Sequence, residues 1–222
     1  MAITTDRFEA VAHPYALLGL EPVATPCIRF DGAGEDVLDR AREAASRAGL
    51  LLITSTRTIE LLWPEQPMPD VAVAAVGERT AATVEAAGGR VVLTGTSGLA
   101  GLIEVAAERL TGARVVFPHA VGSDPVALEL LRGLAPGLDE HEVYRTVPLA
   151  PEPTVVDAVA FASPVAVEGW LLARSFDKLV VGVIGSTTGT AVARHRPPDV
   201  VAPEPSHAAL ARALMSYLEV SV

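Results

Sequence analysis

The sequence predicts an α/β protein made of two similar parallel-sheet domains. Short apolar runs rich in Val and Ile alternate with Ala- and Leu-rich segments of helical length, which is typical of a parallel sheet covered by helices. Small and polar residues also recur at one fixed separation in two parts of the chain, as expected when one unit occurs twice. Half of the 222 residues are hydrophobic and 20% are charged, so the chain can bury a substantial core.

The secondary structure follows from these runs taken in order. The apolar runs end at Gly, Pro, Thr or Asp, as buried strands do, and predict strands at 2–5, 23–25, 50–54, 71–76, 90–93, 114–118, 158–162, 179–184 and 200–201. Several of the intervening segments open on Ser, Asp or Pro, which start helices. They predict helices at 8–18, 35–48, 57–62, 79–87, 98–110, 125–134, 164–173, 188–194 and 206–218. We expect Pro14 to kink or delay the first helix.

The repeat defines the domains. Identical residues stand 108 positions apart at Ser55/Ser163, Glu60/Glu168, Gly77/Gly185, Thr80/Thr188 and Val84/Val192. The second copy runs out of chain after the strand at 200–201 and one more helix, so we expect the N-terminal strands to complete its sheet. The predicted fold is therefore two flavodoxin-like or Rossmann-like domains joined by a two-stranded connector. The predicted limits are 1–25 plus 154–222 for one domain, 32–142 for the other, and 26–31 and 143–153 for the connector.

Four strands run into polar turns that open helices: ITSTRT at 53–58, AVGERTA at 75–81, FASPVA at 161–166 and VIGSTTG at 183–189. In parallel sheets these turns lie at the carboxyl edge, where ligands of α/β proteins bind. Helix starts offer unpaired N–H groups and a partial positive charge, and a glycine lets the backbone approach a ligand. The turns are predicted anion sites, although their serines and threonines equally fit helix caps.

Several function classes are excluded by what the sequence lacks. Neither glycine turn has the second glycine of a dinucleotide fingerprint or the lysine of a phosphate-binding loop. The five histidines form no metal-binding spacing, and Cys27 is the only cysteine, so no thiol pair exists. A net charge of −10 disfavours nucleic acid. No apolar run is long enough for a membrane span and no signal peptide is evident, so we expect a cytoplasmic protein, with a monomer as the default.

Taken together, the motifs resemble the uroporphyrinogen-III synthase family. The resemblance is carried by TTDR at 4–7, LLLITSTRTIELL at 50–62, AVGERTAATVEAAGG at 75–89, VVFPHA at 115–120, EVYRT at 142–146, VDAVAFASPVAVEGW at 156–170, VIGSTTGTAV at 183–192 and VVAPEPSHAAL at 200–210. It implies a lyase that cyclises hydroxymethylbilane to uroporphyrinogen III, with loss of water and inversion of the last pyrrole ring. It also implies that no cofactor is used and that the substrate is held in a cleft between the domains.

The resemblance also implies site residues. Tyr144 is the residue proposed in the family to help the hydroxyl group leave. The serines and threonines implied at the substrate site are Ser55, Ser163, Thr80, Thr187 and Thr188.

To these residues we add the turn glycines, Gly77 and Gly185, and three arginines that follow strands, Arg7, Arg57 and Arg79. Guanidinium groups at these places would pair with substrate carboxylates. The alternatives are surface arginines at helix starts and a Tyr144 ring that packs at a domain junction.

Two other functions stay open at this point. One is a two-domain protein that closes on a small anion without chemistry, and the other is a regulatory protein with a degenerate synthase domain. Isomer analysis of the product made from fresh hydroxymethylbilane discriminates them from the enzyme.

Overall fold

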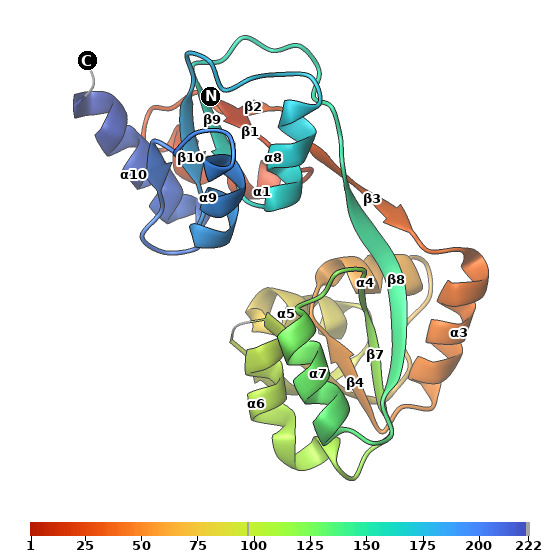
Figure 1. The fold of residues 1–222 in the computed structure, drawn as a ribbon. Helices are drawn as coiled ribbons and strands as arrows, with labels where there is room; N and C mark the ends of the chain where they lie inside the picture. Colours follow the sequence, from red (N-terminus) through yellow and green to blue (C-terminus); the bar gives the residue numbers. More distant parts are fainter. Residues whose placement is uncertain (97, 221–222) are drawn as a thin grey trace. The chain divides into compact units, whose positions relative to one another are not determined.

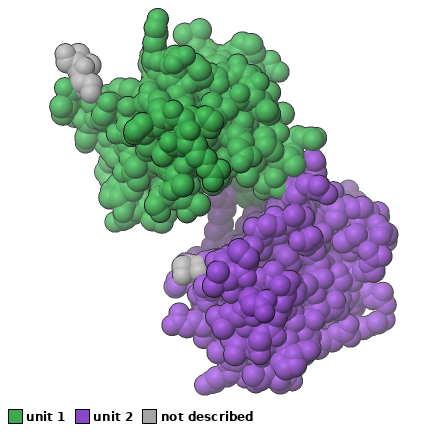
Figure 2. All heavy atoms as spheres, viewed as in Figure 1, with its two compact units in different colours: residues 1–30, 146–222 green, residues 31–145 purple. Residues whose placement is uncertain are grey.

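A computed structural model describes residues 1–96 and 98–220, and the chain forms two compact units (Figure 1). Unit 1 comprises residues 1–30 and 146–222, and unit 2 comprises residues 31–145 (Figure 2). The chain therefore begins in unit 1, builds unit 2 and returns. The finer limits given above, with residues 26–31 and 143–153 as connectors, stay a prediction.

The sheet of unit 2 has six strands in the order β3-β8-β7-β4-β5-β6. Their bounds are β3 Ile28–Gly32, β4 Leu50–Ile53, β5 Ala72–Val76, β6 Arg90–Gly95, β7 Val115–Ala120 and β8 Asp139–Pro148. The pairs β8/β7, β7/β4, β4/β5 and β5/β6 are parallel. β3 begins in the part of the chain assigned to unit 1, and β8 ends in it.

Helices cover both faces of this sheet, which explains its unbroken apolar strands. Leu50, Leu52 and Phe117 pack against residues of α6 and α7 in one core, while Leu51 and Ile53 alternate to the opposite face. On that face α3, α4 and α5 contact one another in succession. The helix bounds are α3 Glu35–Ser46, α4 Thr56–Leu62, α5 Gly77–Ala86, α6 Gly98–Leu110 and α7 Pro125–Leu134.

The sheet of unit 1 has five strands in the order β11-β10-β9-β1-β2, all parallel to their neighbours. Their bounds are β1 Ala2–Ile3, β2 Val23–Ala24, β9 Ala158–Phe161, β10 Val180–Val183 and β11 Val200–Val201. One core contains Trp170 and residues of α8 and α9, and the other contains Tyr15 and residues of α10. The helices are α1 Phe8–Val11, α2 His13–Ala16, α8 Pro164–Leu171, α9 Ser186–Ala193 and α10 His207–Val220.

The two sheets share one topology. The order β6-β5-β4-β7-β8 in unit 2 corresponds to β11-β10-β9-β1-β2 in unit 1, so β1 and β2 stand where β7 and β8 stand in the other copy. The predicted α/β class with two similar parallel-sheet domains is confirmed. No helix among the described residues is long and apolar enough to cross a membrane.

Some predicted bounds are wrong. The helix expected at 8–18 is two short helices, and Pro14 lies in the first turn of α2, where its missing N–H costs nothing. α5 starts at Gly77 and α9 at Ser186, because both helices begin inside the polar turn rather than after it. β8 begins at Asp139 and pairs with β7, so the second connector segment continues a strand of the sheet.

The two linking segments are joined by backbone hydrogen bonds. The Ala33 N–H donates to the Val143 carbonyl oxygen at 2.8 Å, and the Leu149 N–H donates to the Cys27 carbonyl oxygen at 2.9 Å. The later residue of the first segment, Ala33, pairs with the earlier residue of the second, Val143, so β3 and β8 run antiparallel. The chain thus passes between the units on two paired strands.

Candidate functional site

The carboxyl edge of the unit 2 sheet brings two predicted turns together. β4 and β5 are parallel neighbours, so the turns after them lie side by side. Ser55 caps α4, with its hydroxyl oxygen accepting from the Arg57 N–H at 3.2 Å. α5 begins at Gly77, which has φ +70° and no side-chain cap before it. The residue before α5 therefore supplies no side-chain acceptor for the first N–H groups of the helix.

The two arginines and the threonine predicted to bind substrate at this edge differ in solvent exposure. Arg57 is half-buried and Arg79 is exposed, each in the first turn of its helix. Thr80 is only 7% exposed. Arg79 therefore offers more surface to a ligand than Thr80 does.

The carboxyl edge of unit 1 has the same construction. Ser163 caps α8, with its hydroxyl oxygen accepting from the Ala166 N–H at 3.3 Å. Gly185 precedes α9 with an extended φ of 178°. Thr187 is exposed and Thr188 is 3% exposed, so the first of the two threonines provides the accessible hydroxyl.

Two further features complete the unit 1 edge. Arg7 follows β1 and precedes α1, and its N–H donates to the Thr5 hydroxyl oxygen at 3.3 Å. Because β1 pairs with β9 and β9 with β10, its turn is on the same edge as Ser163 and Gly185. A cavity of ≈ 350 Å³ opens here along α9 and is lined by Pro164, Ser186, Thr187, Thr190, Ala191 and Arg194.

Tyr144 lies on β8 and lines a cavity of ≈ 260 Å³ in unit 2. The tyrosine is 8% exposed, so most of the residue is buried although it lines the cavity. Arg145 lines the same cavity and supplies a cation, while Asp31 and Glu142 supply carboxylates. The remaining wall is Gly32, Ala33, Gly34, Val37 and Val121.

Residues 31–34 and Val121 are cavity residues that the sequence analysis missed. The cavity exists because β8 begins at Asp139 and carries Tyr144 between the start of α3 and the turn after β7. The pairing of β8 with β7 is a long-range property. The glycines before Glu35 were the only local signal, since they mark a turn that precedes a helix.

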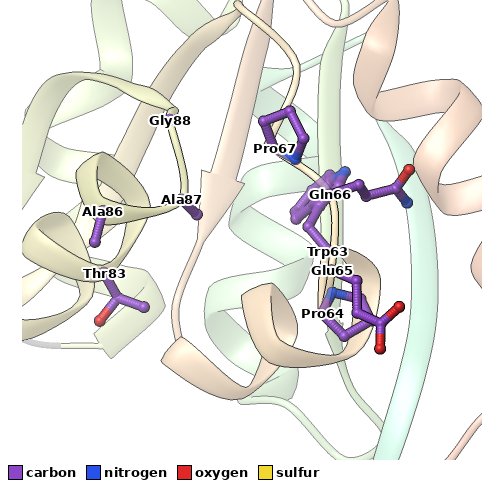
Figure 3. A pocket seen from close by; sticks show the side chains of 9 residues that line it. All are labelled: Trp63, Pro64, Glu65, Gln66, Pro67, Thr83, Ala86, Ala87 and Gly88. Atoms are coloured by element: carbon purple, nitrogen blue, oxygen red, sulfur yellow. The ribbon is translucent and has the colours of Figure 1, made fainter.

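A larger cavity of ≈ 640 Å³ lies elsewhere in unit 2 (Figure 3). Its walls are residues 63–67, which follow α4, and Thr83 and residues 86–88 at the end of α5. Both helices start at the carboxyl edge, so their ends lie at the amino edge of the sheet. No predicted site residue lines this cavity.

Neither a metal nor a thiol nucleophile is offered by the described residues. Within 1–96 and 98–220, no group of three or more His, Cys, Asp and Glu side chains could hold a metal ion. Burial raises the pKa of the Cys27 thiol to about 12, so the thiol stays protonated at neutral pH. The arrangement is suited to binding anions with backbone amides, hydroxyls and arginines.

Comparison with known proteins decides the family. A family model described as uroporphyrinogen-III synthase HemD matches residues 10–212. The chain belongs to the uroporphyrinogen-III synthase family. The family predicted from the motifs is confirmed, and with it the tetrapyrrole substrate and the cyclising hydro-lyase activity of that family.

Solved structures of uroporphyrinogen-III synthases share the fold. The chain is similar to the uroporphyrinogen-III synthetase of Helicobacter pylori, with 16% identity, a TM-score of 0.62 and coverage of 91% of this chain and 92% of that one. It is also similar to a mutant uroporphyrinogen III synthase of Thermus thermophilus, with 16% identity, a TM-score of 0.57 and coverage of 99% and 98%. No curated protein sequence matches the chain significantly.

Proposed function

We propose that this uroporphyrinogen-III synthase binds the carboxylates of hydroxymethylbilane at the carboxyl edges of both sheets and uses Tyr144 as the acid for the departing hydroxyl. The observation that carries the reaction is the family match over residues 10–212. The accessible cavity around Tyr144 supports the role of its phenol. Nothing favours a non-catalytic binding or regulatory function.

The chemistry demands little of the protein's side chains. When the hydroxyl of hydroxymethylbilane takes a proton and leaves as water, a conjugated azafulvenium cation results. The substituted carbon of the last ring then attacks it, and the spiro intermediate fragments and recloses with that ring inverted. Closure finally releases a proton, which restores the acid. The main task of the enzyme is therefore to position the last ring so that its substituted carbon attacks, which prevents the simpler closure without inversion. Proton donation is a smaller contribution.

The edges supply the positioning. The helix start at Gly77 and the turn at Gly185 present N–H groups to carboxylates, and Ser55 and Ser163 hold neighbouring helix starts in place. Thr187 adds an exposed hydroxyl. Thr80 and Thr188 contribute through the small part of each that reaches the surface.

Arg7, Arg57 and Arg79 add the positive charge that an acidic protein needs in order to hold a polyanion. In this proposal the enzyme needs no cofactor or metal. It acts as a monomer in the cytoplasm, without nucleic acid or membrane partners.

The test is the isomer ratio of the product made from freshly prepared hydroxymethylbilane. The wild-type chain is expected to give uroporphyrinogen III, and Tyr144→Phe to lower kcat by at most about a hundredfold, because the substrate also loses its hydroxyl spontaneously. The variant should also release more of the uninverted isomer. Tyr217→Phe removes the same atom from α10 and is the control, expected to match the wild type. Equal kcat in both variants would reject Tyr144 as the acid.

A further inference from the structure

His119 is a buried histidine whose environment packing alone does not explain. It lies on β7, is 2% exposed and stacks on Phe117 with a ring-centroid distance of 4.6 Å. Among the described residues its Nε2 has no hydrogen-bond partner, and the Glu140 Oε2 atom, itself bound by Arg132, is 3.8 Å away. A buried polar atom without a partner destabilises the folded protein. A phenyl ring would fill the same place without that cost.

The other ring nitrogen closes a turn. Nδ1 is 2.8 Å from the Ala120 carbonyl oxygen and 3.1 Å from the Ser123 Oγ. A carbonyl oxygen can only accept, so Nδ1 carries the hydrogen. The Ser123 hydroxyl donates to the same carbonyl at 2.9 Å, and the Ser123 N–H does so at 3.3 Å. Gly122 has φ +78°, which the third position of a type II turn requires.

This turn, residues 120–123, holds the backbone of Tyr144. The Val121 N–H donates to the Tyr144 carbonyl oxygen at 2.8 Å, and Val121 also lines the Tyr144 cavity. His119 pairs with Glu142 but Ala120 pairs with Tyr144, so Val143 is an extra residue on β8. Such bulges redirect side chains next to active sites. The turn therefore contacts β8 where the direction of Tyr144 is set.

We propose that His119 is a positioning residue for the tetrapyrrole reaction: its Nδ1–H fixes turn 120–123, and this turn fixes Tyr144 at the bulge. The inference rests on the proposed role of Tyr144. His119 touches neither substrate nor reacting atoms and acts through two hydrogen bonds, one to Ala120 and one from Val121 to Tyr144. The unpartnered Nε2 is the cost of placing a donor at Nδ1.

Three substitutions separate this role from packing. His119→Phe keeps a ring on Phe117 and removes both nitrogens. His119→Asn puts an amide donor where Nδ1 stands, whereas His119→Gln puts it near Nε2.

We expect His119→Phe to keep or raise Tm, to leave KM unchanged and to lower kcat about tenfold, because small displacements of reacting groups are costly. It should also release more uninverted isomer and speed hydrogen exchange at the Val121 amide. His119→Asn should restore kcat and slow exchange, and His119→Gln should not.

Other outcomes reject the proposal in distinct ways. If His119→Phe matches the wild type in kcat, isomer ratio and Val121 exchange, His119 does not position Tyr144. If kcat follows Tm across the three variants, His119 is a packing residue only. If the wild type itself yields just the product of spontaneous closure, the proposed function fails. The exchange rate of the Val121 amide then still decides whether His119 holds Tyr144.

Discussion

The two copies of the strand, glycine and helix motif have the same sequence pattern but different backbones. Gly77 has φ +70° and is the first residue of α5, whereas Gly185 has φ 178° and precedes α9. Positive φ favours glycine, while extended backbone accepts any residue. The glycine is therefore a conformational requirement in unit 2, whereas the backbone of unit 1 would accept another residue at this position.

A second difference lies where the linking segments pass the helices. Gly169 of α8 stands against the Cys27 and Leu149 carbonyl oxygens, and a Cβ there would collide with the first and lie 2.8 Å from the second. The matching position in unit 2 is Leu61, whose Cδ2 would lie 3.5 Å from a Cβ at Gly32. Unit 1 thus packs backbone directly on a helix, and unit 2 inserts a side chain.

The largest effect is expected from Gly169→Ala. Two backbone carbonyls block the new methyl group and cannot rotate away, so we expect a loss of about 3 kcal/mol in the free energy of unfolding. Denaturant melts monitor the loss. Gly133→Ala is the control, because a Cβ at this α7 position meets nothing within 4 Å and alanine favours helix by up to about 1 kcal/mol. If Gly169→Ala is as stable as Gly133→Ala, the close approach is not real.

Next in size is the effect of removing the cations of the two edges. Arg57→Ala and Arg79→Ala in unit 2, and Arg7→Ala in unit 1, are each expected to raise KM about tenfold through loss of a charge-assisted hydrogen bond. Steady-state kinetics with hydroxymethylbilane measure the change. Arg47→Ala removes the same charge from the far end of α3, where Arg47 pairs with Glu43, and should leave KM unaltered. Unchanged KM in all three edge variants would end the idea that arginines bind the substrate.

The smallest effect separates the two turn glycines. Gly77→Ala forces a left-handed backbone on alanine and should cost about 1 kcal/mol of stability, while Gly185→Ala should cost less than about 0.5 kcal/mol. Thermal melts of the two single variants provide the comparison. Equal losses would mean that the backbones of the two turns are alike after all.

Much of the fold could be predicted because its causes are local. Apolar runs predicted every strand of the unit 1 sheet and β4 to β7 of the unit 2 sheet, whereas β3 and β8 were expected only as the connectors 26–31 and 143–153. The identity of Ser55 with Ser163 and of Gly77 with Gly185 pointed to a repeated unit. The different φ angles of those glycines could not be predicted, because the two turns have the same strand, glycine and helix pattern.

Part of the candidate site could be predicted, because the turns that follow strands also have a local sequence signal. The turns after strands were found, but Val121 and residues 31–34 were not, since they join Tyr144 only through the pairing of β8 with β7. The link from His119 to Tyr144 likewise requires the bulge at Val143.

Unit 1 is built from the two ends of the chain, and this affects how the protein folds while the ribosome makes it. β1 sits between β2 and β9, yet the ribosome makes β9 only after the whole of unit 2. A nascent chain that has just passed residue 150 has every strand of the unit 2 sheet, while β1 and β2 still expose an unpaired edge. Such edges promote aggregation, so the interval before β9 emerges is when the growing polypeptide most needs a chaperone.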